Sequence, residues 1–140
     1  MKKFVLMICA ALLIGGGCSK TPPANEETTY SIQSLLNTSS LSQSYPGSTI
    51  TIDILAREYN DAGECVDIET IDDIQYADRH LITANKLSKK VTIRVSTEME
   101  YNGKTASVDK WIQQVFYLEE DDNTEVVITD ETIVGNNEPI

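Results

Sequence analysis

The chain has 140 residues, 41% of them hydrophobic and 24% charged, so it is long enough for one folded domain and is not composed like a disordered protein. Its formal net charge is −11, with 22 acidic and 11 basic residues. An acidic surface repels phosphate backbones, which argues against a nucleic-acid partner and favours proteins, glycans or metal ions. Such a surface also simply keeps a protein soluble, and this interpretation stays open.

Residues 1–17 have the pattern of a secretory signal peptide. Lys2 and Lys3 supply a positive start, and the apolar stretch 4–14 (FVLMICAALLI) is too short to span a bilayer as a mature helix. Small residues at 15–17 then precede Cys18. This arrangement resembles the lipobox of bacterial lipoproteins, which implies cleavage before Cys18 and acylation of its thiol. Cleavage by ordinary signal peptidase, without lipid, is the alternative.

The resemblance also implies a location in the cell. A lipid on Cys18 would attach the protein to a membrane of the cell envelope, and Ser19 favours the outer membrane in families that use a sorting rule. Residues 18–29 are polar, and Pro22 and Pro23 hold this segment extended, so it is predicted to be a flexible tether. The side of the membrane that the protein faces stays open, and no cofactor is expected.

Residues 30–135 are predicted to form an all-β domain because β-branched and aromatic residues alternate with polar ones. Residues 49–59 put Ile50, Ile52, Ile54 and Ala56 on one face of a strand, and residues 60–63 (NDAG) form a turn. Residues 70–89 fit a helix or a strand, and a loop with a short strand near 81–84 is preferred. About seven strands without a long helix predict a two-sheet β-sandwich of immunoglobulin-like architecture.

The clearest predicted element is a hairpin over residues 90–118, because Asn102 and Gly103 suit a two-residue type I′ turn. The register that places Tyr101 opposite Lys104 brings the apolar faces of the two strands together as far as the pair of Ile93 and Ile112. Lys110 opposite Val95 and Gln114 opposite Val91 break this pattern, so a bulge or an edge is expected at these places.

The C-terminal part is expected to complete a three-stranded meander. A turn at 121–123 leads into a strand over 124–134, and residues 136–140 form a frayed tail. The acidic run 119–123 offers oxygen atoms to calcium but lacks the spacing of an EF-hand, so a solvated turn is preferred and no metal site is predicted.

The sequence carries no catalytic motif, so an enzyme is not predicted. Cys65 and His80 are of the types that form a nucleophile and base, yet a buried filler cysteine and a surface histidine explain them more simply. One histidine and one thiol in the mature chain are too few for a structural zinc site.

One candidate binding surface remains. Trp111 and Tyr117 are predicted to share a strand face, with Arg94 opposite Trp111, and this face is a possible glycan-binding platform. Alternatively, Trp111 belongs to the core and Arg94 covers it by a cation–π contact. The predicted function is a non-enzymatic, membrane-tethered interaction or structural module of the cell envelope; the alternative is a glycan-binding accessory lipoprotein.

Overall fold

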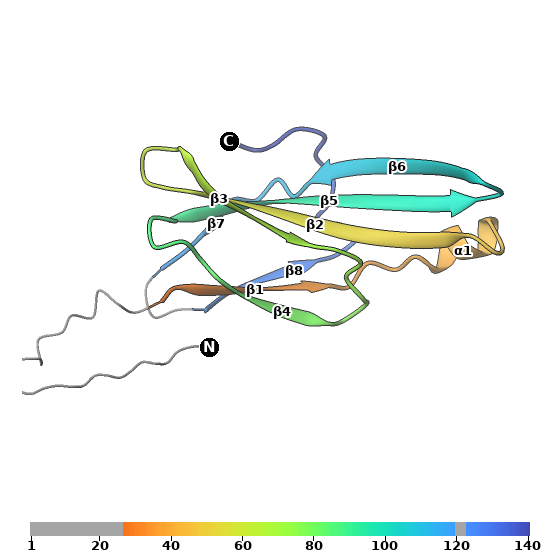
Figure 1. The fold of residues 1–140 in the computed structure, drawn as a ribbon, viewed down its shortest axis with the longest axis horizontal. Coiled ribbons are helices and arrows are strands. Elements are labelled where there is room, and N and C mark those ends of the chain that lie inside the picture. The colour runs from red at the N-terminus through yellow and green to blue at the C-terminus, as the bar shows by residue number, and fades with distance from the viewer. Residues whose placement is uncertain (1–26, 120–122) are drawn as a thin grey trace, which may run out of the picture.

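The structure is a computed structural model that describes residues 27–119 and 123–140. It confirms an all-β chain whose strands form two sheets, of three and five strands, in a sandwich-like arrangement (Figure 1). The elements in chain order are β1 (Thr29–Ser34), α1 (Ser39–Ser44), β2 (Thr49–Tyr59), β3 (Cys65–Ile71), β4 (Arg79–Thr83), β5 (Lys90–Tyr101), β6 (Lys104–Trp111), β7 (Phe116–Tyr117) and β8 (Asn123–Ile128).

The predicted leader, Cys18 and residues 18–26 of the predicted tether lie outside the described residues, as does most of the acidic run at 120–122. The described part of the chain contains no helix with the length and hydropathy needed to cross a membrane. The first strand begins at Thr29, one residue before the predicted start of the domain.

The five-stranded sheet has the order β3-β2-β5-β6, with β7 beside β5. Strand β2 has the predicted bounds, and its alternation buries Ile52, Ile54 and Ala56. The predicted hairpin register is also confirmed, since Tyr101 lies opposite Lys104 and this pairing continues to Arg94 and Trp111. Hairpin formation follows from the turn, where Asn102 and Gly103 have φ values of 53° and 76° as a type I′ turn requires.

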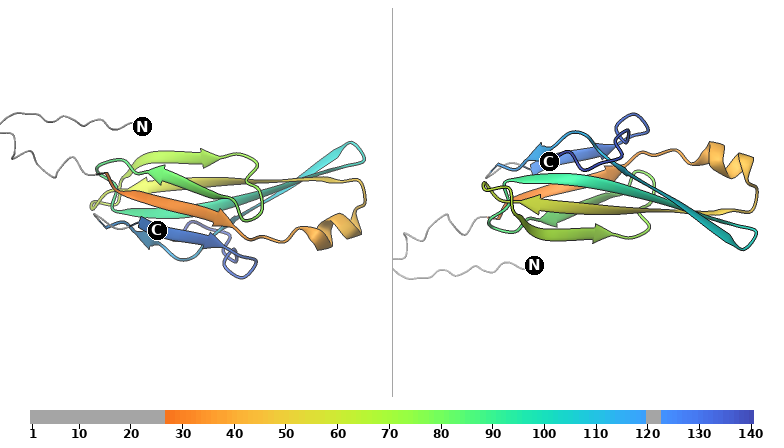
Figure 2. Two further views of the ribbon diagram at one scale, coloured as in Figure 1. Left: turned by 90° about the horizontal axis from the view of Figure 1, so that it is seen from below. Right: turned by 90° about the horizontal axis from the view of Figure 1, so that it is seen from above.

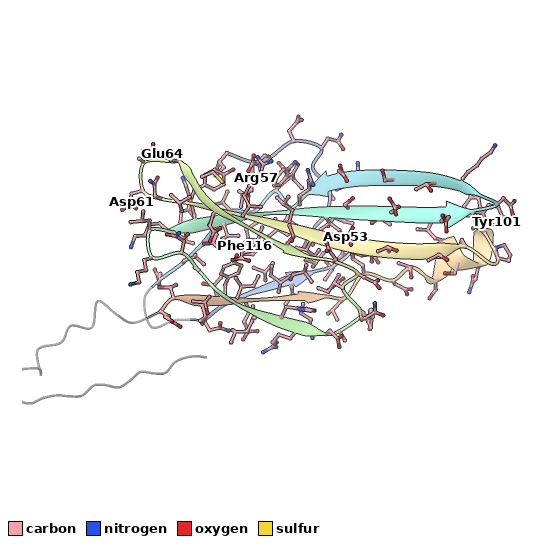
Figure 3. The ribbon with its side chains drawn as sticks, in the orientation of Figure 1. Asp53, Arg57, Asp61, Glu64, Tyr101 and Phe116 are labelled. Carbon is pink, nitrogen blue, oxygen red and sulfur yellow. The ribbon has the colours of Figure 1, made fainter. Side chains whose placement is uncertain are left out.

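A bulge or an edge was expected at two places, and the structure has a change of register at one of them. Lys110 lies opposite Val95 in the regular ladder, so the expectation there is wrong, and the register changes at Gln114. The Ile112 amide still donates to the Ile93 carbonyl at 2.9 Å, and β6 ends there. The chain then bends and returns as β7, in which Phe116 lies opposite Val91. Continuing the earlier register would have placed Gln114 there, so the strand restarts two residues later. Phe116 then points between the two sheets (Figure 3).

The predicted C-terminal meander is wrong. Strand β8 does not pair with the β5–β6 hairpin. It pairs in parallel with β1, in the sheet of order β4-β1-β8. The physical reason is burial: from this position Val126 and Ile128 reach the core between the sheets, where they are almost completely buried beside Ile32 of β1. The strand also ends at Ile128, six residues before the predicted end.

The middle of the chain forms two strands joined by a loop. Strand β3 pairs with β2, and β4 pairs with β1, so the loop over residues 72–78 crosses from one sheet to the other. The preference for loop and short strand over helix is confirmed, although the strand lies at 79–83. Ile74 in the loop is buried, and its amide donates to the carbonyl of Ile52 at 2.8 Å.

The core lies between the sheets and takes side chains from both. Its members are Tyr30, Ile32, Leu36, Ile52, Ile54, Ala56, Ile74, Ala84, Val91, Ile93, Val95, Ile112, Leu118, Val126 and Ile128. The β5–β6 hairpin and helix α1 extend beyond the three-stranded sheet (Figure 2). At the tip of this hairpin Tyr101 stacks edge to face on Tyr45, with ring centroids 5.3 Å apart.

Replacement of Ile93 by Ala tests the position of the core. Ile93 is completely buried, so removing its side chain leaves a cavity and is expected to lower the free energy of unfolding by about 2–5 kcal/mol. Ile68→Ala is the matched control because Ile68 is 50% exposed, and its expected cost is below about 1 kcal/mol. Urea denaturation measures both values, and equal costs for the two variants would contradict the assignment of the core.

Candidate functional site

Trp111 lies on the outer face of the five-stranded sheet, the face turned away from the core, and not between the sheets. Arg57 and Arg94 flank it, with guanidinium carbons 5.5 Å and 6.0 Å from the ring centroid. The ring is only 8% exposed, so it is not an open platform for stacking a sugar. The cation–π contact predicted for Arg94 is present, and Arg57 supplies a second one.

Tyr117 is separated from Trp111 by the break in the strand. It lies in β7 opposite Lys90 and is 67% exposed. Because β6 ends at Trp111, the continuous strand face predicted from Trp111 to Tyr117 does not form. The structure therefore brings Arg94 and Trp111 together but does not join Tyr117 to them in one regular face.

The C-terminal segment, residues 135–140, covers the edge of β6, and the prediction of a frayed tail is wrong. Gly135 forms an antiparallel bridge with Trp111: the Trp111 amide donates to the Gly135 carbonyl at 2.7 Å, and the Gly135 amide donates back at 3.1 Å. Lys110 Nζ donates to Asn136 at 2.7 Å, and the side-chain amide of Gln113 donates to the Asn137 carbonyl at 3.1 Å.

This pairing brings the carboxylate of Glu138 onto the outer face of the sheet. Arg57 forms an ion pair with it at 3.1 Å, and the Thr92 hydroxyl donates to it at 3.0 Å. The Tyr59 hydroxyl also donates to it. We call Arg57, Tyr59 and Thr92 the Glu138 niche. Figure 3 shows Arg57 on the side of the sheet toward the C-terminus.

The environment of the niche favours a bound carboxylate. Burial raises the pKa of Tyr59, and its hydrogen bond to Glu138 raises the pKa further, so the phenol stays a proton donor. A charged and hydroxyl donor set of this kind forms hydrogen bonds that are about twice as strong as neutral ones.

Comparisons with protein-family models, curated proteins and solved structures found no match for this chain.

A second carboxylate, that of Glu58, is enclosed between the sheets. Glu58 follows Ile52, Ile54 and Ala56 on the inner face of β2 and is completely buried. The Tyr30 hydroxyl donates to one of its oxygens at 2.8 Å. The other oxygen accepts from the Asn85 amide at 2.8 Å and the Ser88 hydroxyl at 2.6 Å, so both oxygens of the buried carboxylate have partners.

Two further carboxylates lie near Glu58, because Asp67 and Glu69 of β3 point to the same inner side. Oxygens of the three groups lie within 4.8 Å of one another, which is a spacing that one cation can bridge. The Glu58 oxygens are already engaged by three donors, and calcium takes 6–8 oxygen ligands. The cluster therefore offers a cation chiefly Asp67 and Glu69, and we treat it as a charged part of the fold.

Cys65 and His80 are placed in different sheets. Cys65 begins β3 and is exposed, so the prediction of a buried filler cysteine is wrong; its thiol lies 3.6 Å from the Asp67 carbonyl. His80 lies in β4 opposite Ile32 and is partly buried. Within residues 27–119 and 123–140 no hydrogen bond joins the two side chains.

The Tyr30→Phe variant tests whether the buried carboxylate is held as described. Burial, followed by the charge of Glu58, raises the pKa of Tyr30, which keeps its hydroxyl protonated as a donor. Loss of this donor leaves one oxygen of Glu58 unsatisfied, with an expected cost of about 1–3 kcal/mol in unfolding free energy. Tyr45→Phe is the control, since Tyr45 is 40% exposed and keeps its ring. An unchanged stability of Tyr30→Phe in denaturant titration would refute the contact.

The Glu69→Gln variant tests the crowding of the carboxylates by its pH dependence. Burial, then the charges of Asp67 and Glu58, raise the pKa of Glu69 above its ordinary value of 4.5. The folded protein therefore tolerates the protonated carboxyl group of Glu69 better than its ionised form. The stability that protonation supplies is fully present below pH 4.5 and is lost as the pH rises through the raised pKa.

We expect Glu69→Gln to melt at a higher temperature than the unmodified protein at pH 7 and at nearly the same temperature at pH 4. The control is Glu100→Gln, which removes one negative charge at an exposed position on the hairpin. Calorimetric melts at the two pH values measure the difference. A shift that is the same at both pH values, or that matches the control, would show that Glu69 is not crowded.

Proposed function

We propose that this protein is a membrane-tethered lipoprotein of the bacterial cell envelope that acts as a non-enzymatic interaction module. The observation that carries this proposal is the order of the first eighteen residues: basic start, apolar stretch, small residues and then Cys18. Cleavage there would leave 22 acidic and 9 basic residues, a net charge of −13, on the mature chain. In lipoprotein families whose destination depends on the residue after the acylated cysteine, Ser19 favours transport to the outer membrane.

The tether supports the same proposal. Residues 18–29 are polar, and the first strand starts only at Thr29, so the sheets do not need to touch the membrane. Each acyl methylene that enters the membrane contributes about 0.8 kcal/mol, and two or more chains hold a protein stably where one holds it marginally. The fold itself then needs no membrane-facing surface.

The distribution of chemical groups supports binding more than catalysis. A pocket beside α1 is lined by Leu36, Asn37, Thr38, Ser39 and Tyr76, which include no carboxylate, imidazole or thiol. The outer face of the five-stranded sheet instead gathers arginines, hydroxyl groups and an aromatic ring around Glu138. Such a set of donors is suited to recognition of an anionic group.

We also propose that the two sheets belong to the immunoglobulin-like class of sandwiches. Eight strands in sheets of three and five, connected by loops that pass between the sheets, support this assignment. The glycan-binding alternative has less support, because Trp111 is covered on the outer face by Arg57 and Arg94 and by the C-terminal segment.

Metabolic labelling with radioactive palmitate tests the anchor. In a bacterium that acylates lipoproteins, the protein is expected to incorporate label, and Cys18→Ala is expected to lose it. Cys9→Ala and Cys65→Ala are matched controls that keep the label, since these cysteines lie inside the leader and in the domain. Absence of label in the unmodified protein, or its retention in Cys18→Ala, would overturn the lipid anchor.

A further inference from the structure

The contacts of residues 135–140 show how the outer face of the five-stranded sheet recognises a chain segment. The main chain of Trp111 pairs with Gly135 as a strand edge pairs with an added strand. Three positions further on, the Glu138 niche receives a carboxylate. Backbone pairing fixes the direction of the segment, and the niche selects one acidic side chain.

This surface also has unused donors. Arg57 Nε and Arg94 Nε are buried, and neither has a hydrogen-bond partner among the described residues. A buried donor without a partner costs about 1–3 kcal/mol, so donors left in this state mark a place where a further acceptor would be favourable. Both guanidinium groups lie beside the ring of Trp111.

The C-terminal segment is attached in a way that permits its release. Asn136, Asn137 and Ile140 are exposed, and the Glu138 side chain remains 19% exposed. The side-chain hydrogen bonds of the segment are polar contacts, at the edge of β6 for Asn136 and Asn137 and on the outer face for Glu138. The segment also covers Trp111, but none of its residues belongs to the core between the sheets. Segments that contribute nothing to the core can open locally without unfolding the domain.

We propose that this surface is a binding site for an extended acidic peptide segment of a partner protein, and that the chain's own C-terminal segment occupies the site in this structure. Displacement of residues 135–140 exposes the outer edge of β6 at Trp111 and frees the Glu138 niche. A partner strand then pairs with that edge and places a glutamate against Arg57, Tyr59 and Thr92.

A peptide fits the observations better than a sugar because recognition begins with main-chain groups. The Trp111 amide and carbonyl both point to the free edge of β6, where a polypeptide satisfies them together. The paired residue is Gly135, and a larger residue there would displace the exposed side chain of Gln113. The predicted ligand pattern is therefore an extended segment with a glutamate three residues after the residue that pairs with Trp111.

The acidic net charge of the protein does not prevent this binding. At physiological ionic strength the Debye length is about 8 Å, so distant carboxylates are largely screened at the site. Arg57, Arg94 and Lys110 lie around the segment, and Asp109 lies on the same face two positions before Trp111. The ion pair of Arg57 with Glu138 forms in this setting, so the acidic net charge does not keep a carboxylate from the niche.

The inference rests on the proposed role as an interaction module, but its test does not depend on the membrane. The probe is an acetylated and amidated hexapeptide with the sequence of residues 135–140 (GNNEPI), and a second peptide carries glutamine in place of glutamate. Trp111 is the only tryptophan of the chain, so its fluorescence reports binding at the site. The attached segment competes with the probe at an effective concentration that reaches the millimolar range.

The Glu138→Gln variant weakens this competitor and is expected to bind the glutamate peptide roughly tenfold more tightly than the unmodified protein does. The glutamine peptide is expected to bind at least about tenfold more weakly to the same variant. Adding Arg57→Gln to Glu138→Gln is expected to abolish binding, whereas adding Arg79→Gln, on the other sheet, preserves it. Thermal melts confirm that each variant is folded.

Equal binding of the two peptides, or no binding of either by folded Glu138→Gln, would overturn the proposal. Saturable binding of galacturonate without binding of the peptide would assign the niche to an acidic sugar and would also overturn it. Either result leaves palmitate labelling unaffected, so failure of the peptide site and failure of the membrane anchor are distinguishable.

Discussion

The buried carboxylate of Glu58 is the constraint on which the meeting of the two sheets depends. A charged group removed from water costs several kcal/mol unless its partners are in place. Those partners come from separate parts of the chain: the Tyr30 hydroxyl from the opposite sheet, and the Asn85 amide and Ser88 hydroxyl from the turn before β5. Satisfying Glu58 therefore fixes β1, β2 and this turn relative to one another, while apolar packing supplies most of the stability.

The protein binds a second carboxylate, Glu138, with similar chemistry but in a different setting. Each carboxylate accepts hydrogen bonds from a tyrosine and from a serine or threonine hydroxyl. Glu58 lies between the two sheets, whereas Glu138 lies on the outer face of one of them. Glu58 is enclosed in the core and belongs to a long central strand, so it cannot leave without unfolding. Glu138 lies at the surface on a terminal segment and is balanced by Arg57. The first carboxylate is therefore structural, and the second is exchangeable if the C-terminal segment opens as we propose.

Periodicity and turn chemistry were enough to predict the local structure of β2 and of the β5–β6 hairpin, but they did not predict helix α1 or strand β3. Strand β2, the hairpin at Asn102 and Gly103 and its register follow from alternation and from positive φ, which are properties of neighbouring residues. The placement of β8 beside β1 depends on which buried surface is open to it, and alternation does not encode that choice. The Glu138 niche joins Glu138 to residues 46 to 81 positions away, so no local signal reveals it. For the other carboxylate the sequence does hold a clue, because Glu58 is an acidic residue in register with the apolar face of β2.

Native-state hydrogen exchange distinguishes a fixed inner carboxylate from an exchangeable outer one in a single experiment. The amide of Asn85, which donates to Glu58, should exchange only with the free energy of global unfolding. The amide of Gly135, which pairs with Trp111, should exchange through local opening at a clearly lower free energy. Equal opening free energies for the two amides would contradict an exchangeable outer carboxylate, because the C-terminal segment would then be as much a part of the core structure as Glu58.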